Sequence, residues 1–84
     1  MKGKISKRGS EYWLTYSLDE WFADGIDRRK QQIATEFAVG SSEYLGVRLL
    51  LDAEEPGDVA RSINFIFSDE KAAQVADMFF TDFA

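Results

Sequence analysis

The sequence predicts an α+β domain, in which a four-stranded antiparallel sheet of two hairpins carries one C-terminal helix on one face. Three observations support this fold class. Apolar and polar residues alternate along much of residues 12–67, which is the period of half-buried strands. Turn signals containing glycine interrupt the alternation. After Ser68 the apolar period changes from that of a strand to that of a helix.

The composition limits the domain count and the chemistry. A chain of 84 residues predicts a single domain, residues 1–84, and 45% hydrophobic residues suffice for a core. Histidine and cysteine are absent, so the commonest general base and the most nucleophilic side chain are missing. No glycine pattern matches a phosphate-binding loop. We therefore expect a protein that is not an enzyme, with no catalytic residue, no metal and no cofactor.

The N-terminal residues 1–10 are basic, with no apolar stretch behind them that would make a signal peptide. No apolar run approaches the roughly 18 residues of a transmembrane helix. We therefore expect a cytoplasmic protein without a membrane partner. Residues 1–10 are expected to form either a mobile basic arm or a short edge strand, ended by the turn signal Gly9-Ser10.

The next stretch, residues 11–39, predicts one long hairpin folded about Asp24-Gly25. Alternation runs from Tyr12 and resumes along residues 31–39, and Asp-Gly suits a two-residue turn with positive φ.

The register of this hairpin follows from the two-residue turn, with Ala23 facing Ile26, and a slip of one residue would turn the apolar face of the second arm outward. The register places Glu20 opposite Arg29, and Asp19 opposite Lys30. A short helical turn at residues 19–23, which would interrupt the strand, is the alternative left open.

A second hairpin is predicted from the strands at residues 44–52 and 60–67. Their apolar faces match only if opposed residue numbers sum to an even number. That excludes a two-residue Pro56-Gly57 loop and favours an odd-length loop, such as residues 55–59.

The C-terminal segment predicts a helix that Ser68 caps, with Asp69 and Glu70 in its first turn. Met78 and Phe80 lie off its main apolar stripe, where they either extend the core contact or mark a second contact surface. The stripe itself consists of Ala72, Val75, Ala76, Phe79 and Phe83. It is expected to cover a sheet face made by Leu14, Tyr16, Ile33, Phe37, Val47, Leu49, Ile63 and Phe65.

The outward side of the predicted sheet is unusually apolar and is the candidate partner-binding surface. Tryptophan and arginine are enriched among interface hot spots, and Trp21 would lie opposite Arg28, close enough for a cation–π contact. The alternative is that the N-terminal arm or a self-associating sheet covers this face. The candidate residues are Trp13, Trp21, Arg28, Arg48, Leu50 and Ile66.

Charge is polarised along the chain, whose net charge is −5. Residues 1–30 hold seven basic and five acidic side chains, whereas residues 31–84 hold three basic and ten acidic ones. Small size, missing catalytic groups and charge polarity are similar in kind to small inhibitors encoded by phages and mobile elements. We expect a small acidic protein-binding module that inhibits a host nucleic-acid-processing or defence complex, with a homodimer as a further option.

Basic and aromatic residues also suggest direct nucleic-acid binding as the alternative function. The segments Gly3-Lys4-Ile5-Ser6-Lys7-Arg8-Gly9, Tyr12-Trp13 and Asp27-Arg28-Arg29-Lys30-Gln31 resemble the arm-type DNA-binding domain of tyrosine recombinases. That resemblance implies a three-stranded sheet followed by a helix, with DNA bound by the sheet. It covers about the first third of the chain. The hairpin at residues 44–67 and the acidic C-terminal part depart from the family pattern.

Overall fold

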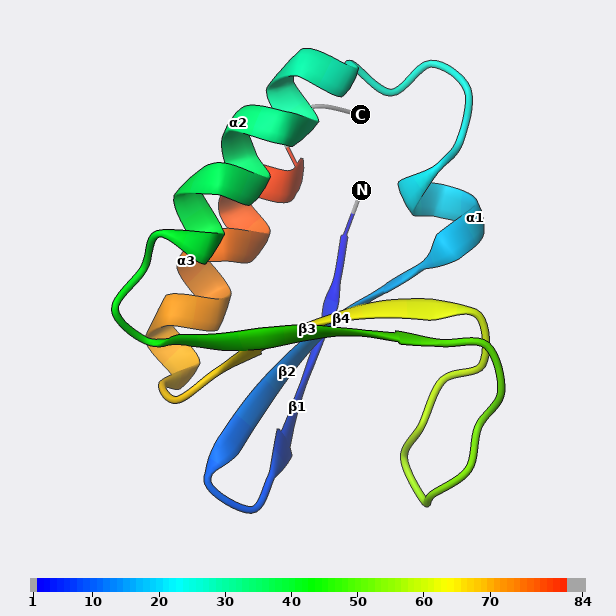
Figure 1. The fold of residues 1–84 in the computed structure, drawn as a ribbon, viewed down its shortest axis with the longest axis vertical. Helices are drawn as coiled ribbons and strands as arrows, with labels where there is room; N and C mark the ends of the chain where they lie inside the picture. Colours follow the sequence, from blue (N-terminus) through cyan, green and yellow to red (C-terminus); the bar gives the residue numbers. More distant parts are fainter. Residues whose placement is uncertain (1, 82–84) are drawn as a thin grey trace.

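The computed structural model describes residues 2–81 and contains a four-stranded antiparallel sheet, with three helices on one of its faces (Figure 1). The C-terminal helix packs on the sheet, so the predicted fold class is confirmed. In chain order the elements are β1 (Lys4–Arg8), β2 (Glu11–Ser17), α1 (Leu18–Trp21), α2 (Arg28–Val39), β3 (Tyr44–Leu50), β4 (Ser62–Phe67) and α3 (Glu70–Thr81).

Two hairpins build the sheet, whose strand order is β1-β2-β4-β3. β1 and β2 turn at Gly9-Ser10, where the φ of 60° at Gly9 suits the first position of a type II′ loop. Of the two expectations for residues 1–10, the edge strand is therefore the one observed. β3 and β4 form the second hairpin, with Val47 opposite Phe65, so the predicted even register is confirmed.

The long hairpin predicted at residues 11–39 is wrong in its second half, because residues 28–39 form helix α2. The Asp27 side chain accepts hydrogen bonds from the backbone N–H groups of Arg29 and Lys30, which caps the first turn. Arginine, lysine, glutamine, alanine and glutamate dominate the helix, and all are strong helix formers. Its buried residues, Gln31, Ala34 and Ala38, follow the helical period.

The residue pairs predicted across this hairpin therefore do not form. β2 pairs instead with β1 and β4, and Asp19 forms an ion pair with Arg61 at 3.2 Å rather than with Lys30. The alternative of a short helical turn after β2 is confirmed by α1. Ser17 caps it by accepting from the backbone N–H of Glu20 at 3.1 Å.

The core is centred on four aromatic rings from four different elements. Trp21 of α1 lies 5.5 Å from Tyr16 of β2, 5.3 Å from Phe65 of β4 and 5.2 Å from Phe80 of α3, measured between ring centroids. Phe65 and Phe80 are 5.0 Å apart. Tilted and edge-on contacts of this kind add about 0.5–1.5 kcal/mol per pair beyond apolar burial. The cluster therefore fixes where α1 and α3 pack on the sheet.

Helix α3 faces the core with a different stripe from the predicted one. Asp69, rather than Ser68, caps it by accepting from the backbone N–H of Ala72 at 3.2 Å. Phe80 is fully buried and Phe79 is exposed. Phe80 therefore occupies the core position that the sequence predicted for Phe79. Aromatic packing with Trp21 explains the reversal, since it selects the face that carries Phe80. The buried stripe consists of Ala73, Ala76 and Phe80; the predicted contact of Phe83 lies outside residues 2–81.

The orientation of α3 is testable with two neighbouring phenylalanines. Phe80→Ala should destabilise the domain by about 3–5 kcal/mol, because it empties the centre of the aromatic cluster. Phe79→Ala, the matched control, should cost no more than about 1.5 kcal/mol, since its ring is partly solvated. Urea denaturation measures both. Equal losses, or a larger loss for Phe79→Ala, would contradict the observed face of α3.

Candidate protein interface

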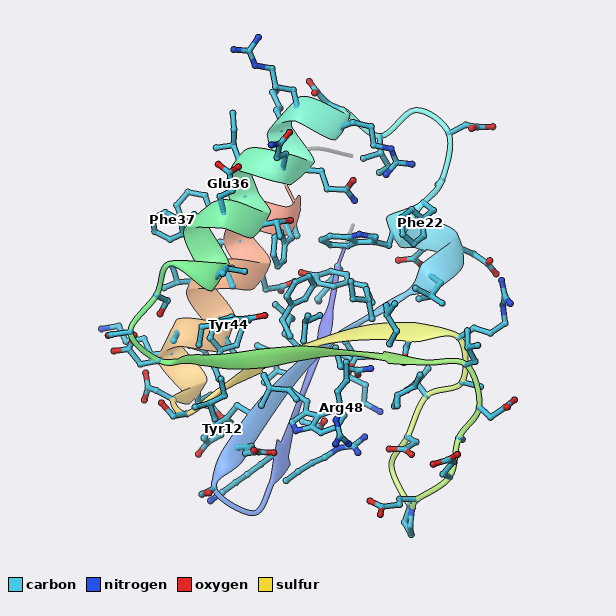
Figure 2. All side chains as sticks on the ribbon, viewed as in Figure 1. Tyr12, Phe22, Glu36, Phe37, Tyr44 and Arg48 are labelled. Atoms are coloured by element: carbon cyan, nitrogen blue, oxygen red, sulfur yellow. The ribbon has the colours of Figure 1, made fainter. Side chains whose placement is uncertain are left out.

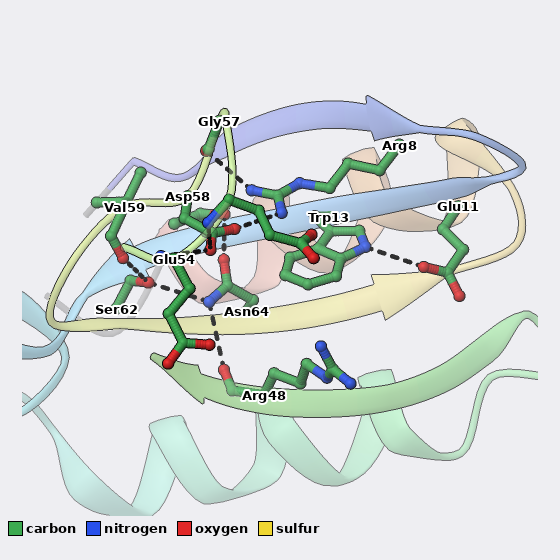
Figure 3. Close-up of polar contacts among 12 residues, drawn as sticks. Arg8, Glu11, Trp13, Arg48, Glu54, Gly57, Asp58, Val59, Ser62 and Asn64 are labelled. Carbon is green, nitrogen blue, oxygen red and sulfur yellow. Dashed lines mark hydrogen bonds and ion pairs between the residues drawn. The ribbon is translucent and has the colours of Figure 1, made fainter. Parts of the chain in front are cut away.

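The outer face of the sheet, away from the helices, is closed by the loop of residues 51–61 (Figure 3). The guanidinium of Arg8 lies 4.0 Å from the centroid of the Trp13 ring. Its two terminal nitrogens donate to a carboxylate oxygen of Asp58 at 2.6 Å and to the carbonyl of Gly57 at 2.8 Å. As a result Trp13 is only 6% exposed.

Asp58 is the anchor of this loop. One carboxylate oxygen binds Arg8, and the other accepts from the backbone N–H groups of Glu54 and Glu55 at 3.1 and 2.9 Å. The hydrogen bond from Arg8, supported by these two N–H groups, lowers the pKa of Asp58 from 3.8 to about 2. The carboxylate is therefore ionised at neutral pH, and the loop is held by charge-assisted hydrogen bonds.

Polar side chains beneath the loop are satisfied by one another. Thr15 donates to the Asn64 carbonyl oxygen at 2.6 Å, and the Asn64 amide donates to the Ser62 hydroxyl at 3.0 Å and the Arg48 carbonyl at 3.3 Å. Ser62 in turn donates to the carbonyl of Val59. Within residues 2–81, no buried side-chain nitrogen or oxygen lacks a partner, so the outer face needs no further polar ligand.

The six residues predicted to bind a partner therefore do not form one open surface. Trp13 and Ile66 lie on the outer face as expected, but both are buried. Trp21 is in the core, which corrects its placement, because α1 turns it inward onto Phe65. Arg48 remains exposed and Leu50 is half-buried, both on β3 at the rim of the sheet.

Arg28, the sixth predicted residue, secures the segment between α1 and α2. Its guanidinium donates to the carbonyls of Trp21 at 2.7 Å and Ala23 at 3.0 Å, and to the side chain of Gln31 at 2.8 Å. It lies 5.9 Å from the centroid of Phe22, so the predicted stacking on Trp21 is replaced by stacking on its neighbour. Arg28 is therefore engaged within the chain.

An aromatic pair on the helix layer forms an exposed apolar feature on that side of the molecule. Phe37 of α2 and Phe79 of α3 lie 4.3 Å apart between ring centroids and are 53% and 42% exposed. Ile33, one helical turn before Phe37, is 58% exposed. Figure 2 shows Phe37 projecting from α2 away from the sheet. We call Ile33, Phe37 and Phe79 the helix face.

Depressions adjoin the helix face on two sides. One of about 310 Å³ is lined by Lys30, Ile33, Ala34, Phe37 and Phe79. Another, of about 560 Å³, continues along the groove between the C-terminal half of α2 and the N-terminal half of α3, and Phe37 lines it as well. Glu43 at its rim accepts from the Ser41 hydroxyl, and this bond lowers the pKa of Glu43. The groove is thus apolar with a charged rim.

β3 forms a second exposed apolar surface. It is an edge strand, and its Leu45, Val47 and Leu49 are all exposed. Val47 and Leu49 point to the helix side, because they pair with core residues of β4, but α2 leaves them uncovered. We call the open side of this strand, with Leu45, Val47 and Leu49, the β3 edge.

Tyr16 in the core is joined by a hydrogen bond to Asp77 of α3. The Tyr16 hydroxyl donates to an Asp77 carboxylate oxygen, which also accepts from the backbone N–H of Gly3 at 2.9 Å. Burial, reinforced by Asp77, raises the pKa of Tyr16 well above its usual value. The phenol stays protonated and ties β1, β2 and α3 together, which is a structural role.

Neither a metal cluster nor a membrane span is found in the part of the chain that the structure describes. No three or more Asp, Glu, His or Cys side chains of residues 2–81 come together as metal ligands. No helix in this range has the length and apolar character needed to cross a membrane. Comparison of the chain with protein-family models, curated proteins and solved structures finds no match.

The helix face was missed in the sequence because Ile33, Phe37 and Phe79 occupy positions that predict burial. An available signal was the i, i+4 spacing of Ile33 and Phe37, which fits a helix as well as a strand.

The contact between Arg8 and Asp58 makes a pH-dependent prediction. Asp58→Asn should lower the melting temperature at pH 7, because Arg8 loses an ionised partner. The lowered pKa means that this stabilisation is present above about pH 4 and is lost as the pH falls through about 2. The gap in melting temperature, measured by circular dichroism, should therefore close over that interval. A gap that stays constant down to low pH would contradict the role of the carboxylate.

Proposed function

We propose that this chain is a non-catalytic protein-binding module that docks a partner through the helix face. The observation that supports the proposal is the stacked and exposed pair Phe37–Phe79, with Ile33 beside it. Aromatic residues are enriched at the centres of protein interfaces, where they supply large contact area at low conformational cost. In a monomer, two phenylalanines whose rings are in contact are ordinarily buried.

The shape of this surface favours a partner with protruding apolar side chains. Two depressions lined by Phe37, of about 310 and 560 Å³, offer room for them. The larger groove is lined by Glu36, Glu43 and Asp69 as well as Lys71, so basic groups that flank the apolar anchors of a partner would be favoured there. We infer a partner segment with apolar anchors and basic flanks.

The proposed biological role is inhibition of a host nucleic-acid-processing or defence complex by a protein from a phage or mobile element. Its support is the small size, the uneven charge and the absence of histidine and cysteine. A cytoplasmic location belongs to the same proposal. Direct nucleic-acid binding gains less support, because Arg8 and Arg28 are engaged in contacts within the chain.

A capture experiment with matched variants tests the helix face. The tagged chain is used to recover partners from a lysate of its native host, alongside Phe37→Asp and the control Phe22→Asp. Phe22 is also an exposed phenylalanine but directly follows α1, outside the helix face. We expect wild type and Phe22→Asp to recover the same stoichiometric protein, and Phe37→Asp to lose it.

Circular dichroism of each variant controls for folding. Retention of the partner by a folded Phe37→Asp variant, or its loss by both variants, would show that the helix face is not the docking surface. The identity of the recovered protein tests the biological role separately, because an inhibitor of the proposed kind must recover a component of a nucleic-acid-processing or defence complex.

A further inference from the structure

We propose that β3 pairs antiparallel with β3 of a second copy of this chain, forming a two-fold symmetric dimer with a continuous eight-stranded sheet. The β3 edge is distinct from the helix face. The inference therefore stands whether or not the helix face binds a partner.

The first argument is the contrast between the two edges of the sheet. In an antiparallel ladder, alternate residues of an edge strand direct their N–H and C=O groups away from the sheet, where another strand can bind them. β1 protects its edge with basic side chains in a sequence of Lys-Ile-Ser-Lys-Arg. β3, with the sequence Tyr-Leu-Gly-Val-Arg-Leu-Leu, carries a single charge over seven residues. β3 shifts register between Tyr44 and Gly46, but from Gly46 to Leu50 it is a regular edge with one charged residue, which favours strand addition.

The second argument is self-complementarity in one register. With Val47 on the two-fold axis, each Val47 faces its counterpart, and Leu49 lies beside Leu45 of the second copy, where β3 shifts register between Tyr44 and Gly46. Arg48 then lies opposite Gly46 of the second copy, the residue without a side chain, around which a Cβ would meet no atom within 4 Å. Of the two neighbouring symmetric registers, the one centred on Arg48 would place two Arg48 side chains directly opposite each other, which is destabilising. The one centred on Gly46 would place Leu49 opposite the charged Glu43. The charge pattern of β3 therefore selects the Val47-centred register.

Burial supports the same partner. On the helix side of the sheet Val47 and Leu49 remain 48% and 62% exposed, next to the exposed Val39 of α2. An added strand lies about 4.8 Å from β3 in the plane of the sheet and would cover these side chains. Because the symmetry repeats the contact, both copies would gain this burial. A depression of about 320 Å³ between α2 and β3, which Val39 and Val47 line, leaves room for side chains of the second copy.

Charge also favours a closed dimer over an open chain of molecules. Pairing β3 with β1 of another copy would be a head-to-tail contact, which generates a ring or an open filament of several copies. That contact would bring Arg48 towards the basic side chains of β1, Lys4 and Lys7. Repulsion among these cations opposes it, whereas the β3–β3 contact closes after two copies.

Cysteine cross-linking tests the register, since the chain contains no cysteine of its own. Cross-strand residues that face each other have Cα atoms about 4.5–5.5 Å apart, within the range of a disulfide. Val47→Cys should therefore form a covalent dimer at least about tenfold faster than Arg48→Cys, whose two copies would be separated by more than about 7 Å. Met78→Cys, exposed on α3, gives the rate of random collisions. Faster cross-linking of Arg48→Cys than of Val47→Cys would overturn the proposal.

The mass in solution tests the dimer without a covalent bond. Light scattering after size-exclusion chromatography should give twice the chain mass for wild type and for Met78→Lys. Val47→Lys should give the mass of one chain while keeping its fold, because a charged edge blocks strand addition. A single-chain mass for wild type at about 0.5 mM would overturn the proposal. A dimer that persists in a folded Val47→Lys variant would do the same.

Discussion

The aromatic cluster of Tyr16, Trp21, Phe65 and Phe80 is the contact on which the rest of the structure depends. It joins the two central strands, β2 and β4, to α1 and α3, and so sets the position of the helix layer. β4 is buried along its whole length, by the helix layer on one face and by the loop of residues 51–61 on the other. A domain of this size has a limited core. With α1 and α3 centred over β2 and β4, α2 only partly covers β3, and the apolar residues of β3 remain at the rim.

The sequence therefore contains more apolar residues at periodic positions than a single copy of the chain buries. Ile33, Phe37 and Phe79 follow patterns typical of core residues, as do Val47 and Leu49, yet all five are exposed. They gather on the helix face and the β3 edge rather than scattering singly over the surface, which is typical of contact surfaces. The outer face of the sheet, in contrast, is covered within the chain. There Arg8 and Asp58 fold a loop over Trp13, and the polar residues below it satisfy one another.

The fold class, the strands β2, β3 and β4 and the C-terminal helix were predictable, because each follows a single clear period. Helix α2 was not, since the alternation of Ile33 and Phe37 suits a strand and a helix equally. The Asp27 cap and the helix formers around it decide the outcome. Two candidate partner-binding residues, Trp13 and Ile66, were correctly predicted to lie on the outer face of the sheet. Its closure depends on Arg8 and Asp58, which are 50 residues apart in sequence, and no local pattern reports such a contact.

Concentration-dependent hydrogen exchange of β3 tests most directly whether an exposed apolar surface of this molecule is a contact surface. Peptides covering residues 44–50 and 4–8 report the two sheet edges in one experiment. Strand addition at the β3 edge predicts that exchange in 44–50 slows as the protein concentration rises, because edge N–H groups gain partners, while 4–8 exchanges at a constant rate. Equal exchange of 44–50 at low and high concentration would contradict the account.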